Sequence, residues 1–369
     1  MLENIKNVYF LGIGGIGMSA LARYFNANGF SVAGYDKVES KLSEQLRAEG
    51  IQVHFEDDPV YIPEDFKNPN FTIVVYTPAI PSNLKELLFF QKNRFDIVKR
   101  SQMLGAITQR QDAICIAGTH GKTTTTTLTS HILHNSFLGC NAFLGGLSKN
   151  FSSNLLLSKK SNVVVIEADE FDRSFLTLTP KMAVITATDA DHLDIYGTYE
   201  EYLKGFEQFA ALIRENGVLV IKKGLPLRLN LQKGVKVYEY STEEGDFHAE
   251  NIRIGNGTIL FDFVYPMGVI KDVELGVPVY VNIENSIAAM AMAILSGLSH
   301  QEIRDAVKSY SGVVRRFDFH IKEENKVLVD DYAHHPNEVK ASVDSIRMLY
   351  ADKKITGVFQ PHLYTRTRD

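Results

Sequence analysis

Two glycine-rich turns stand between a strand-like run and a helix-like run, and both have the spacing of phosphate-binding loops. The first, Gly12-Ile-Gly-Gly-Ile-Gly17, matches G-x-G-x-x-G through Gly12, Gly14 and Gly17, with Gly15 between them. Without Cβ atoms a diphosphate can approach the backbone, and the following helix N-terminus adds partial positive charge. Asp36 ends the next strand-like run, where an acid can bind a ribose. The pattern predicts a nucleotide-containing ligand such as NAD, or else a turn selected only for tight strand–helix packing.

The second turn is more specific. Gly118-Thr-His-Gly-Lys-Thr-Thr124 follows an apolar strand-like run and begins a helix-like run. In such a loop backbone N–H groups surround the phosphates, the lysine meets their outer oxygens and the hydroxyl binds Mg²⁺. The position five before Gly121 is Ile116 rather than glycine, so the loop is shorter than a strict P-loop. A threonine-rich helix start with a solvated lysine does not account for this spacing, and we predict ATP binding. The expected ATP contacts are Gly118, Thr119, His120, Gly121, Lys122, Thr123 and Thr124.

Two acidic groups follow later apolar runs. They are Glu167-Ala-Asp-Glu170 and Asp189-Ala-Asp-His192. The carboxyl ends of parallel strands form the ligand crevice of an open sheet, and carboxylates there are costly unless they meet a cation. The Mg²⁺ that accompanies ATP would be that cation. Asp169 or Asp191 could instead cap a following helix, and histidine is an unusual ligand for Mg²⁺.

Three further polar stretches lie near the end of the sequence. They are Arg315-Arg316, Asp330-Asp-Tyr-Ala-His-His-Pro336 and Gln360-Pro-His-Leu-Tyr-Thr-Arg366. An arginine can neutralise a transferring phosphoryl group, and Asp or His near a strand end can orient a ribose or a nucleophile. Taken alone, a surface arginine pair or a helix start with proline near its first position explains these residues equally well.

Alternating strand-like and helix-like runs must position these groups, and they predict α/β domains with parallel sheets. The loose stretch 217–281, with short β-like runs and glycine turns, predicts antiparallel decoration of the second unit. The expected strands are 8–11, 31–35, 71–76, 113–117, 162–166, 182–186, 326–329 and 355–359. The expected helices are 16–27, 42–49, 285–295, 301–309 and 336–350.

Composition sets the class of protein. The chain has 369 residues, is 45% hydrophobic and 22% charged, and has a net charge of −5. These proportions exclude collagen, coiled coil and wholesale disorder, and give no general attraction to nucleic acid or anionic membranes. Two cysteines in no paired motif fit a reducing compartment, and no apolar stretch approaches the length that spans a membrane. We therefore predict a cytoplasmic multidomain protein without nucleic-acid partners or membrane insertion; the sequence leaves its oligomeric state open.

Together the motifs resemble those of the Mur ligases, the ATP-dependent amide ligases of peptidoglycan precursor synthesis. Seven stretches occur in the family's order within a similarity that runs from residue 8 to 369. They are Gly-Thr-His-Gly-Lys-Thr-Thr (118–124), Glu-Ala-Asp-Glu (167–170), Asp-Ala-Asp-His-Leu-Asp (189–194), Asn-Ile-Glu-Asn-Ser-Ile-Ala-Ala (282–289), Val-Val-Arg-Arg-Phe (313–317), Asp-Asp-Tyr-Ala-His-His-Pro (330–336) and Phe-Gln-Pro-His-Leu-Tyr-Thr-Arg-Thr (359–367).

The resemblance implies a three-domain architecture. Residues 1–107 would form a Rossmann-like domain for a UDP-linked substrate, residues 108–313 a central P-loop ATPase domain with a parallel sheet, and residues 314–369 part of a Rossmann-like amino-acid domain. A strand–helix–strand unit of about 55 residues is too small for a sheet-based core of its own. We therefore expect it to pack on the second domain or to be the start of a truncated third domain.

The resemblance also implies roles for individual residues. The first glycine turn would hold the UDP diphosphate rather than NAD, with Lys122, Glu167, His192 and Arg316 as the catalytic residues. The implied UDP-sugar contacts are Gly12, Gly14, Gly15, Gly17, Asp36, Thr77, Pro78, Ala79 and Arg100. The implied ATP contacts beyond the second turn are Asn282, Asn285, Arg316, Asp331 and His334. Mg²⁺ would be held by Thr123, Glu167 and His192, and the amino acid would face His362 and Arg366.

The first glycine turn and the Asp-Asp-Tyr-x-His-His-Pro motif are most similar to those of the family member that joins L-alanine to UDP-N-acetylmuramate. The implied reaction activates the lactyl carboxylate with ATP and passes it to the amino group through an acyl phosphate. A member that attaches a recycled tripeptide to the same sugar is the closest alternative. Two readings outside the family are an NAD-dependent oxidoreductase built on the first turn and a non-catalytic nucleotide-binding module.

Overall fold

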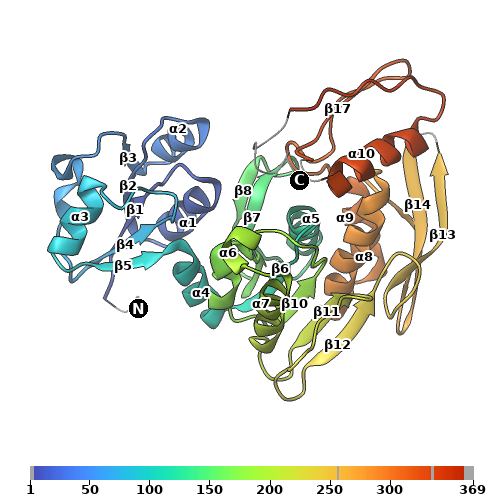
Figure 1. The fold of residues 1–369 in the computed structure, drawn as a ribbon, viewed down its shortest axis with the longest axis horizontal. Coiled ribbons are helices and arrows are strands. Elements are labelled where there is room, and N and C mark those ends of the chain that lie inside the picture. The colour runs from blue at the N-terminus through green and yellow to red at the C-terminus, as the bar shows by residue number, and fades with distance from the viewer. Residues whose placement is uncertain (1–3, 256, 334–335, 361–369) are drawn as a thin grey trace.

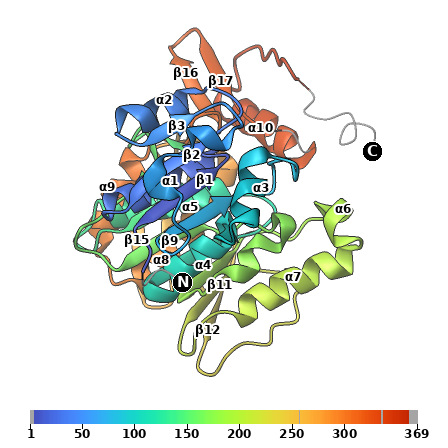
Figure 2. The same ribbon diagram turned by 90° about the vertical axis from the view of Figure 1, so that its left-hand side faces the viewer.

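The computed structural model of the chain describes residues 4–255, 257–333 and 336–360. The N-terminal region forms a domain at one end of the molecule, beside a larger central domain (Figure 1). Figure 2 views the molecule from the N-terminal side and shows this domain in front of the central one. No helix in these described ranges is long and apolar enough to cross a membrane.

The N-terminal domain is built on a five-stranded parallel sheet in the order β3-β2-β1-β4-β5. This order confirms the predicted Rossmann-like topology, since the direction of winding reverses between β1 and β4 and leaves a crevice at their carboxyl ends. Its strands are β1 (Asn7–Leu11), β2 (Ser31–Tyr35), β3 (Gln52–His54), β4 (Thr72–Tyr76) and β5 (Asp96–Lys99). Its helices are α1 (Ile16–Ala27), α2 (Lys41–Ala48) and α3 (Lys85–Lys92), with short 3₁₀ helices η1 (Pro59–Tyr61) and η2 (Glu64–Phe66).

The central domain is built on a seven-stranded sheet in the order β12-β11-β10-β6-β9-β7-β8, parallel except that β8 runs against β7. Its strands are β6 (Asp112–Ala117), β7 (Asn141–Ser148), β8 (Ser153–Leu156), β9 (Val163–Glu167), β10 (Met182–Ile185), β11 (Val218–Lys222) and β12 (Lys236–Tyr240). Its helices are α4 (Arg100–Arg110), α5 (Lys122–His134), α6 (Leu193–Tyr196), α7 (Tyr199–Ala211), α8 (Tyr280–Leu295), α9 (His300–Ser309) and the 3₁₀ helix η3 (Phe171–Thr177).

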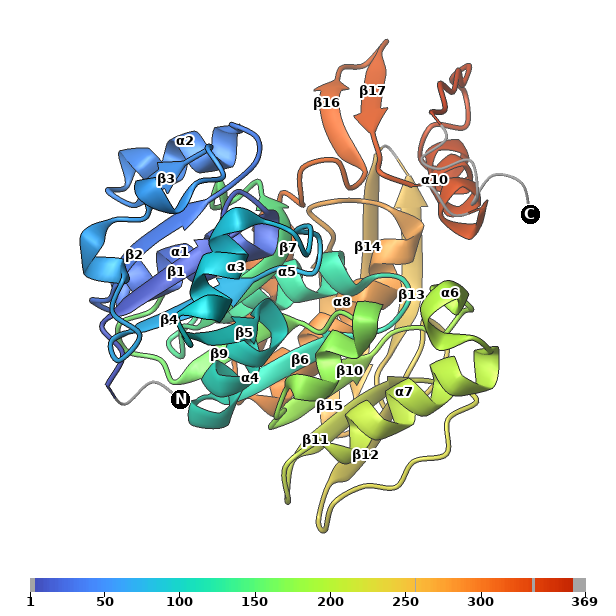
Figure 3. The ribbon, with the colours of Figure 1, turned by 60° about the vertical axis from the view of Figure 1, so that its left-hand side comes forward.

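Side chains alternate across this sheet, so it separates two apolar cores. Ile114 and Ile116 of β6 face the core that contains α5, α8 and α9, whereas Cys115 and Ala117 face the core beneath α7. The second core continues into the N-terminal domain through α1. The two domains therefore share apolar packing, and helices cover both faces of the central sheet (Figure 3).

The prediction of antiparallel decoration over 217–281 is partly wrong. Strands β11 and β12 extend the central sheet in parallel, and only β13 (His248–Gly255), β14 (Thr258–Tyr265) and β15 (Gly268–Glu274) form an antiparallel meander. The connection from β11 to β12 has no helix, which is why its sequence resembles a hairpin loop. Its leucines still pack against the core: Leu225, Leu227, Leu229 and Leu231.

The structure also bears on the predicted start of α8, the predicted domain boundary at residue 107 and the predicted strand 355–359. Helix α8 begins at Tyr280, five residues before the predicted start, because Val279 is the extended residue before its first turn. The predicted division at residue 107 falls within α4, so the domain boundaries stay a prediction. The predicted strand 355–359 is wrong: this segment is irregular and Val358 is 99% exposed. A strand needs a neighbour to satisfy its backbone groups, and no described strand pairs with this segment.

After the central domain, β16 (Asp318–Lys322) and β17 (Val327–Asp330) form an antiparallel hairpin that projects from the body of the molecule (Figure 3). Helix α10 (Pro336–Leu349) follows the hairpin and lies against α8 and β13. This arrangement fits the expectation that the last unit packs on the central domain. It also places Asp331 and Arg316, which flank the hairpin, near the N-terminal end of α8.

Candidate functional site

The first glycine turn follows β1 and leads into α1, and close neighbours explain three of its glycines. A Cβ at Gly12 would lie 2.7 Å from Thr77 Cγ2, and a Cβ at Gly14 would lie 2.9 Å from Asp36 Oδ2. A Cβ at Gly17 would lie 2.7 Å from Arg100 Nη1. Gly12 also has a φ of +88°, which L side chains rarely adopt. Gly12 is therefore required by its backbone conformation, whereas a side chain at Gly14 or Gly17 would displace Asp36 or Arg100.

A cavity of about 660 Å³ opens beside this turn, at the carboxyl ends of β1, β2 and β4. It brings together most of the predicted UDP-sugar residues. Pro78 is the one predicted residue that does not line it within the described chain. The predicted residues that line it are Gly12, Gly14, Gly15, Gly17, Asp36, Thr77, Ala79 and Arg100. The Asp36 carboxylate already accepts a hydrogen bond from the Gly14 backbone N at 2.7 Å, so it holds the turn itself.

The second glycine turn follows β6, the middle strand of the central sheet. Gly121 has a φ of +79° and is the residue before the first turn of α5. Its missing Cβ leaves room for Asn285 Oδ1, which a Cβ would approach to 2.5 Å. Lys122 Nζ donates to the carbonyl oxygen of Gly118 at 2.5 Å and to Glu170 Oε1 at 2.9 Å. Burial alone would lower the pKa of Lys122, but the carboxylates of Glu170 and Glu167 raise it, so the lysine is a cation in the turn.

Glu167 ends β9 and points toward α5. Thr123 Oγ1 donates to Glu167 Oε1 at 3.2 Å, while the buried Oε2 atom has no hydrogen-bond partner. Burial raises the pKa of Glu167, although the charge of Lys122 opposes this shift. A Cβ at Gly145 of β7 would lie 2.2 Å from Glu167 Oε2, so β7 has space for the carboxylate only because residue 145 is glycine. An orphaned carboxylate oxygen beside a hydroxyl and a phosphate-binding turn fits a Mg²⁺ ligand.

His192 does not join this pair in the structure. Its Nε2 atom lies 3.6 Å from Asp191 Oδ2, and its ring packs edge-on against Phe171 at 5.3 Å between centroids. Over the described part of the chain, no three His, Cys, Asp or Glu side chains are clustered closely enough to hold a metal. The structure therefore brings together Thr123 and Glu167 of the predicted metal ligands, and the role of His192 stays a prediction.

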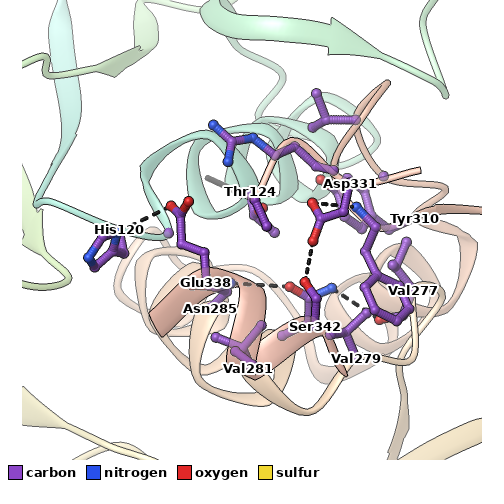
Figure 4. A pocket seen from close by; sticks show the side chains of 18 residues that line it. His120, Thr124, Val277, Val279, Val281, Asn285, Tyr310, Asp331, Glu338 and Ser342 are labelled. Carbon is purple, nitrogen blue, oxygen red and sulfur yellow. Dashed lines mark hydrogen bonds and ion pairs between the residues drawn. The ribbon is translucent and has the colours of Figure 1, made fainter. Parts of the chain in front are cut away.

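A third cavity, of about 120 Å³, lies where the second glycine turn meets α8 and the last unit (Figure 4). Asn285 Nδ2 donates to Asn282 Oδ1 at 3.1 Å, which fixes both amides at its wall. Asp331 accepts hydrogen bonds from the Phe317 backbone N and the Ser342 hydroxyl, and burial raises its pKa. The predicted ATP residues that line this cavity are His120, Gly121, Thr124, Asn282, Asn285, Arg316 and Asp331.

Sequence reasoning missed several residues of this cavity. Glu338 of α10 pairs with the ring of His120, with 3.2 Å between Oε1 and Nδ1, and so joins the last unit to the second turn (Figure 4). Ser342 lies one helical turn further on and binds Asp331. Their i, i+4 spacing after Pro336 was the available signal, since it places both on one face of the predicted helix. Arg316 stacks its guanidinium over the Tyr332 ring at 5.4 Å.

A fourth cavity, of about 170 Å³, lies between the N-terminal and central domains. Gly17 and Arg100 line it from one side, and Gly145, Glu167 and Asp169 line it from the other. Arg100 also lines the cavity beside the first turn, and its Nη2 atom lies 3.9 Å from Asp169 Oδ2. The first glycine turn and the Glu167 carboxylate thus face one shared space. Three predicted residues, His334, His362 and Arg366, lie outside the described residues.

Three family models match the chain in succession. The model described as the Mur ligase family, catalytic domain, matches residues 7–112. The Mur ligase middle domain matches residues 116–293, and the Mur ligase, glutamate ligase domain, matches residues 315–369. The chain belongs to the Mur ligase family, and the predicted resemblance is confirmed.

Individual relatives show which member of the family the chain is similar to. The UDP-N-acetylmuramate–L-alanine ligase of Phocaeicola vulgatus is 58% identical over 368 residues, which cover 100% of this chain and 80% of the relative. The enzyme of the same name from Parabacteroides distasonis is 56% identical over 369 residues, again 100% of this chain and 80% of the relative. Among solved structures, the UDP-N-acetylmuramate-alanine ligase MurC of Thermotoga maritima is 26% identical with a TM-score of 0.83, covering 96% of this chain and 81% of that one.

Proposed function

We propose that the chain catalyses the ATP-dependent ligation of L-alanine to the lactyl carboxylate of UDP-N-acetylmuramate, in the cytoplasm, as a step of peptidoglycan precursor synthesis. The observation that carries this proposal is the shared space between the domains. One side of it is the glycine turn suited to a diphosphate, and the other is Glu167 beside the ATP-type turn. A substrate with a nucleotide diphosphate at one end and a carboxylate at the other can reach both.

The first glycine turn would hold the UDP diphosphate. The start of α1 provides backbone N–H groups, and Arg100 adds a cation against Gly17. Because Arg100 lines both cavities, it would meet the anionic substrate where it passes from the nucleotide end to the reacting end. Asp36 would keep the turn in shape through its bond to the Gly14 N–H group.

The second turn would hold the ATP phosphates. Lys122 remains charged beside Glu170, and the helix that it begins adds partial positive charge. Asn282, Asn285 and Asp331 would line the nucleoside, and Arg316 would add a second cation from the last unit. Thr123 and Glu167 would hold Mg²⁺, which when bound supplies charge neutralisation to the phosphates.

The chemistry follows from the poor electrophilicity of a carboxylate. The lactyl carboxylate attacks the γ-phosphate of ATP, the bond to the β-phosphate oxygen breaks, and ADP leaves. The product is an acyl phosphate. The amine of L-alanine then adds to the activated carbonyl, loses a proton and expels inorganic phosphate from the tetrahedral intermediate. The residues of this chain contribute mainly position and positive charge to the first step, through Lys122 and Arg316.

A ligation assay tests this proposal. Phosphate release should require ATP, UDP-N-acetylmuramate and L-alanine together, and mass spectrometry should detect the amide product. Release that depends on a tripeptide instead of L-alanine would favour the recycling ligase. That alternative has support from fold alone: the tripeptide-type ligase of Neisseria meningitides is 24% identical with a TM-score of 0.73, covering 84% of this chain and 99% of that one.

A further inference from the structure

Asn154 is a polar side chain that is completely buried at the boundary between the two domains. It belongs to β8, an edge strand of the central sheet, but its side-chain hydrogen bonds within the described chain go to α1 of the N-terminal domain. Its Nδ2 group donates to the carbonyl oxygen of Ile16 at 2.5 Å and to Ser19 Oγ at 3.1 Å. Its Oδ1 atom accepts from Arg23 Nη1 at 2.8 Å.

The position of these bonds along α1 matters. Ile16 is the first residue of the helix and part of the glycine turn itself, and Ile16 and Gly17 line both the UDP-sugar cavity and the cavity that contains Glu167. A bond to the Ile16 carbonyl therefore holds the end of the helix that carries the diphosphate turn. The bond crosses from that end to the central domain.

Arg23, which donates to Asn154, also joins α1 to α2. Its Nε atom donates to both carboxylate oxygens of Glu49, at 2.9 and 2.8 Å, and Nη2 donates to Gln45 Oε1 at 3.2 Å. An apolar contact lies beside it, where the rings of Tyr24 and Phe143 approach to 5.3 Å between centroids. Phe143 belongs to β7 and lines the Glu167 cavity, so the β7–β8 hairpin contacts α1 and the reaction centre together.

The amide of Asn154 suits the partners that surround it. The Ile16 carbonyl can only accept, whereas the Arg23 guanidinium can only donate, so one side chain must provide both a donor and an acceptor. Aspartate would place an oxygen against the Ile16 carbonyl. An apolar residue of the same shape would leave these buried groups without partners, which is costly.

We infer that Asn154 is a positioning residue for the ligation: it fixes the first turn of α1, and with it the UDP-sugar, at the correct distance from the phosphate-transfer centre around Glu167. This inference rests on the proposed function, because it assumes that the substrate spans the two cavities. Asn154 touches neither ligand in this account and acts only through the backbone of α1.

Steady-state kinetics of Asn154→Ala and Asn154→Asp test the inference. Both should lower kcat by about 10- to 100-fold, the loss expected from a small misplacement of reactants. The dissociation constants of UDP-N-acetylmuramate and of ATP, each measured alone by calorimetry, should change by no more than about two-fold, because Asn154 lines neither the cavity beside the first turn nor the cavity at the second turn. Asn28→Ala, at the exposed far end of α1 where the side chain donates to the Tyr24 carbonyl oxygen of the same helix, is the matched control and should keep kcat.

A distance measurement provides a readout that does not depend on turnover. Spin labels at Glu44→Cys on α2 and Gln208→Cys on α7 report on the two domains, since both positions are exposed and the native Cys115 and Cys140 are buried. The distance distribution should be narrow in the otherwise unchanged chain. It should broaden in Asn154→Ala and remain narrow in Asn28→Ala.

Each outcome decides the inference. A fall in kcat together with a broader distribution supports it. An unchanged kcat, a fall in kcat with an unchanged distribution, or the loss of ligand binding in both cavities would overturn it. If the unsubstituted chain forms no amide from L-alanine, the proposed function has failed. If it does and Asn154→Ala is equally fast, only the positioning role has failed.

Discussion

The two glycine turns occupy the same place in their domains, each between a central parallel strand and the helix that follows, but they carry charge differently. The first turn contains no charged side chain, and its cation is Arg100, which reaches Gly17 from the start of α4. The second turn contains its own cation, Lys122, which lies 2.8 Å from the buried carboxylate of Glu170. A carboxylate, Asp36, braces the backbone of the first turn.

This difference suggests what each turn binds. A turn without its own cation, open to a large cavity, suits a diphosphate in the middle of a longer molecule. A turn with a partly buried lysine and an adjacent orphaned carboxylate suits terminal phosphates that change charge during the reaction. Similar strand–turn–helix sequences can therefore suit a UDP-linked substrate in one domain and ATP in the other.

The largest expected effect comes from Lys122→Ala. Removal of the cation should lower phosphate release by about 1,000-fold or more, comparable with the loss of a main transition-state contact. UDP-N-acetylmuramate binding should remain, because the N-terminal domain and Arg100 form that cavity and Lys122 does not line it. A phosphate-release assay and calorimetry measure the two quantities. Lys204→Ala, on an exposed lysine of α7, is the control, and full ligation by Lys122→Ala would refute the ATP assignment.

Gly14→Val should weaken binding of the UDP-sugar and leave ATP binding intact, which is the opposite of the effect expected for Lys122→Ala. A Cβ at Gly14 would lie 2.9 Å from Asp36 Oδ2 and inside the first cavity, so UDP-N-acetylmuramate affinity should fall by about 100-fold or more. ATP affinity should be unchanged. Calorimetric titration with each ligand measures both. Gly357→Val, where a Cβ meets no neighbour within 4 Å, controls for a general effect of the added valine.

Gly145→Ala tests the carboxylate of Glu167 beside the second turn. The new methyl group would lie 2.2 Å from Glu167 Oε2 and should displace the carboxylate from Thr123. We expect turnover to fall by about 10- to 100-fold, with a higher Mg²⁺ concentration needed for half-maximal rate. A Mg²⁺ titration of the rate gives the result. Gly255→Ala, in open space on β13, should leave the curve unchanged.

The smallest effect concerns stability and a buried carboxyl group of the N-terminal domain. Glu86 is completely buried, accepts from Tyr9 at 2.7 Å, and burial raises its pKa from 4.5 to about 8. The folded chain therefore keeps a proton that the unfolded chain releases above pH 4.5. Stability should fall as pH rises toward 8, at a slope approaching about 1.4 kcal/mol per pH unit, and the loss should be complete above that pKa.

Glu86→Gln should remove this part of the pH dependence. The urea midpoints of the two proteins at pH 5, 6, 7 and 8 provide the measurement. The curves should diverge toward pH 8, with the glutamine variant the more stable. Parallel curves would mean that Glu86 titrates in the folded chain near its ordinary pKa.

Local patterns in the sequence predicted the local elements well. The apolar run that becomes β1 and the glycine turn after it appear where expected, since neighbouring residues determine both. The prediction for 217–281 was partly wrong because a parallel connection without a helix resembles a hairpin loop until its leucines are seen against the core. The strand at 355–359 was wrong because a strand depends on a partner that its own residues do not reveal.

The residues of the candidate site were likewise predicted where a local pattern indicated them and missed where their contacts come from distant parts of the chain. Thr123 and Glu167 could be paired from the sequence, since parallel strand ends and the following helix starts lie at one edge of a sheet. Glu338 and Ser342 were missed, because their contacts depend on how α10 packs against α8. Asn154 was missed for a similar reason: a single asparagine in an edge strand has no local signature, and its partners lie more than 130 positions away in the chain.

Calorimetric titration of the full chain with UDP-N-acetylmuramate, and separately with NADH, tests most directly whether the first turn carries a UDP-linked substrate. Calorimetry measures binding alone and so needs no turnover. The cavity that would bind the UDP-sugar is formed by the N-terminal domain and Arg100. We predict saturable binding of the UDP-sugar, lost in Gly14→Val, and no binding of NADH. Binding of NADH without binding of the UDP-sugar would refute the assignment of the first turn.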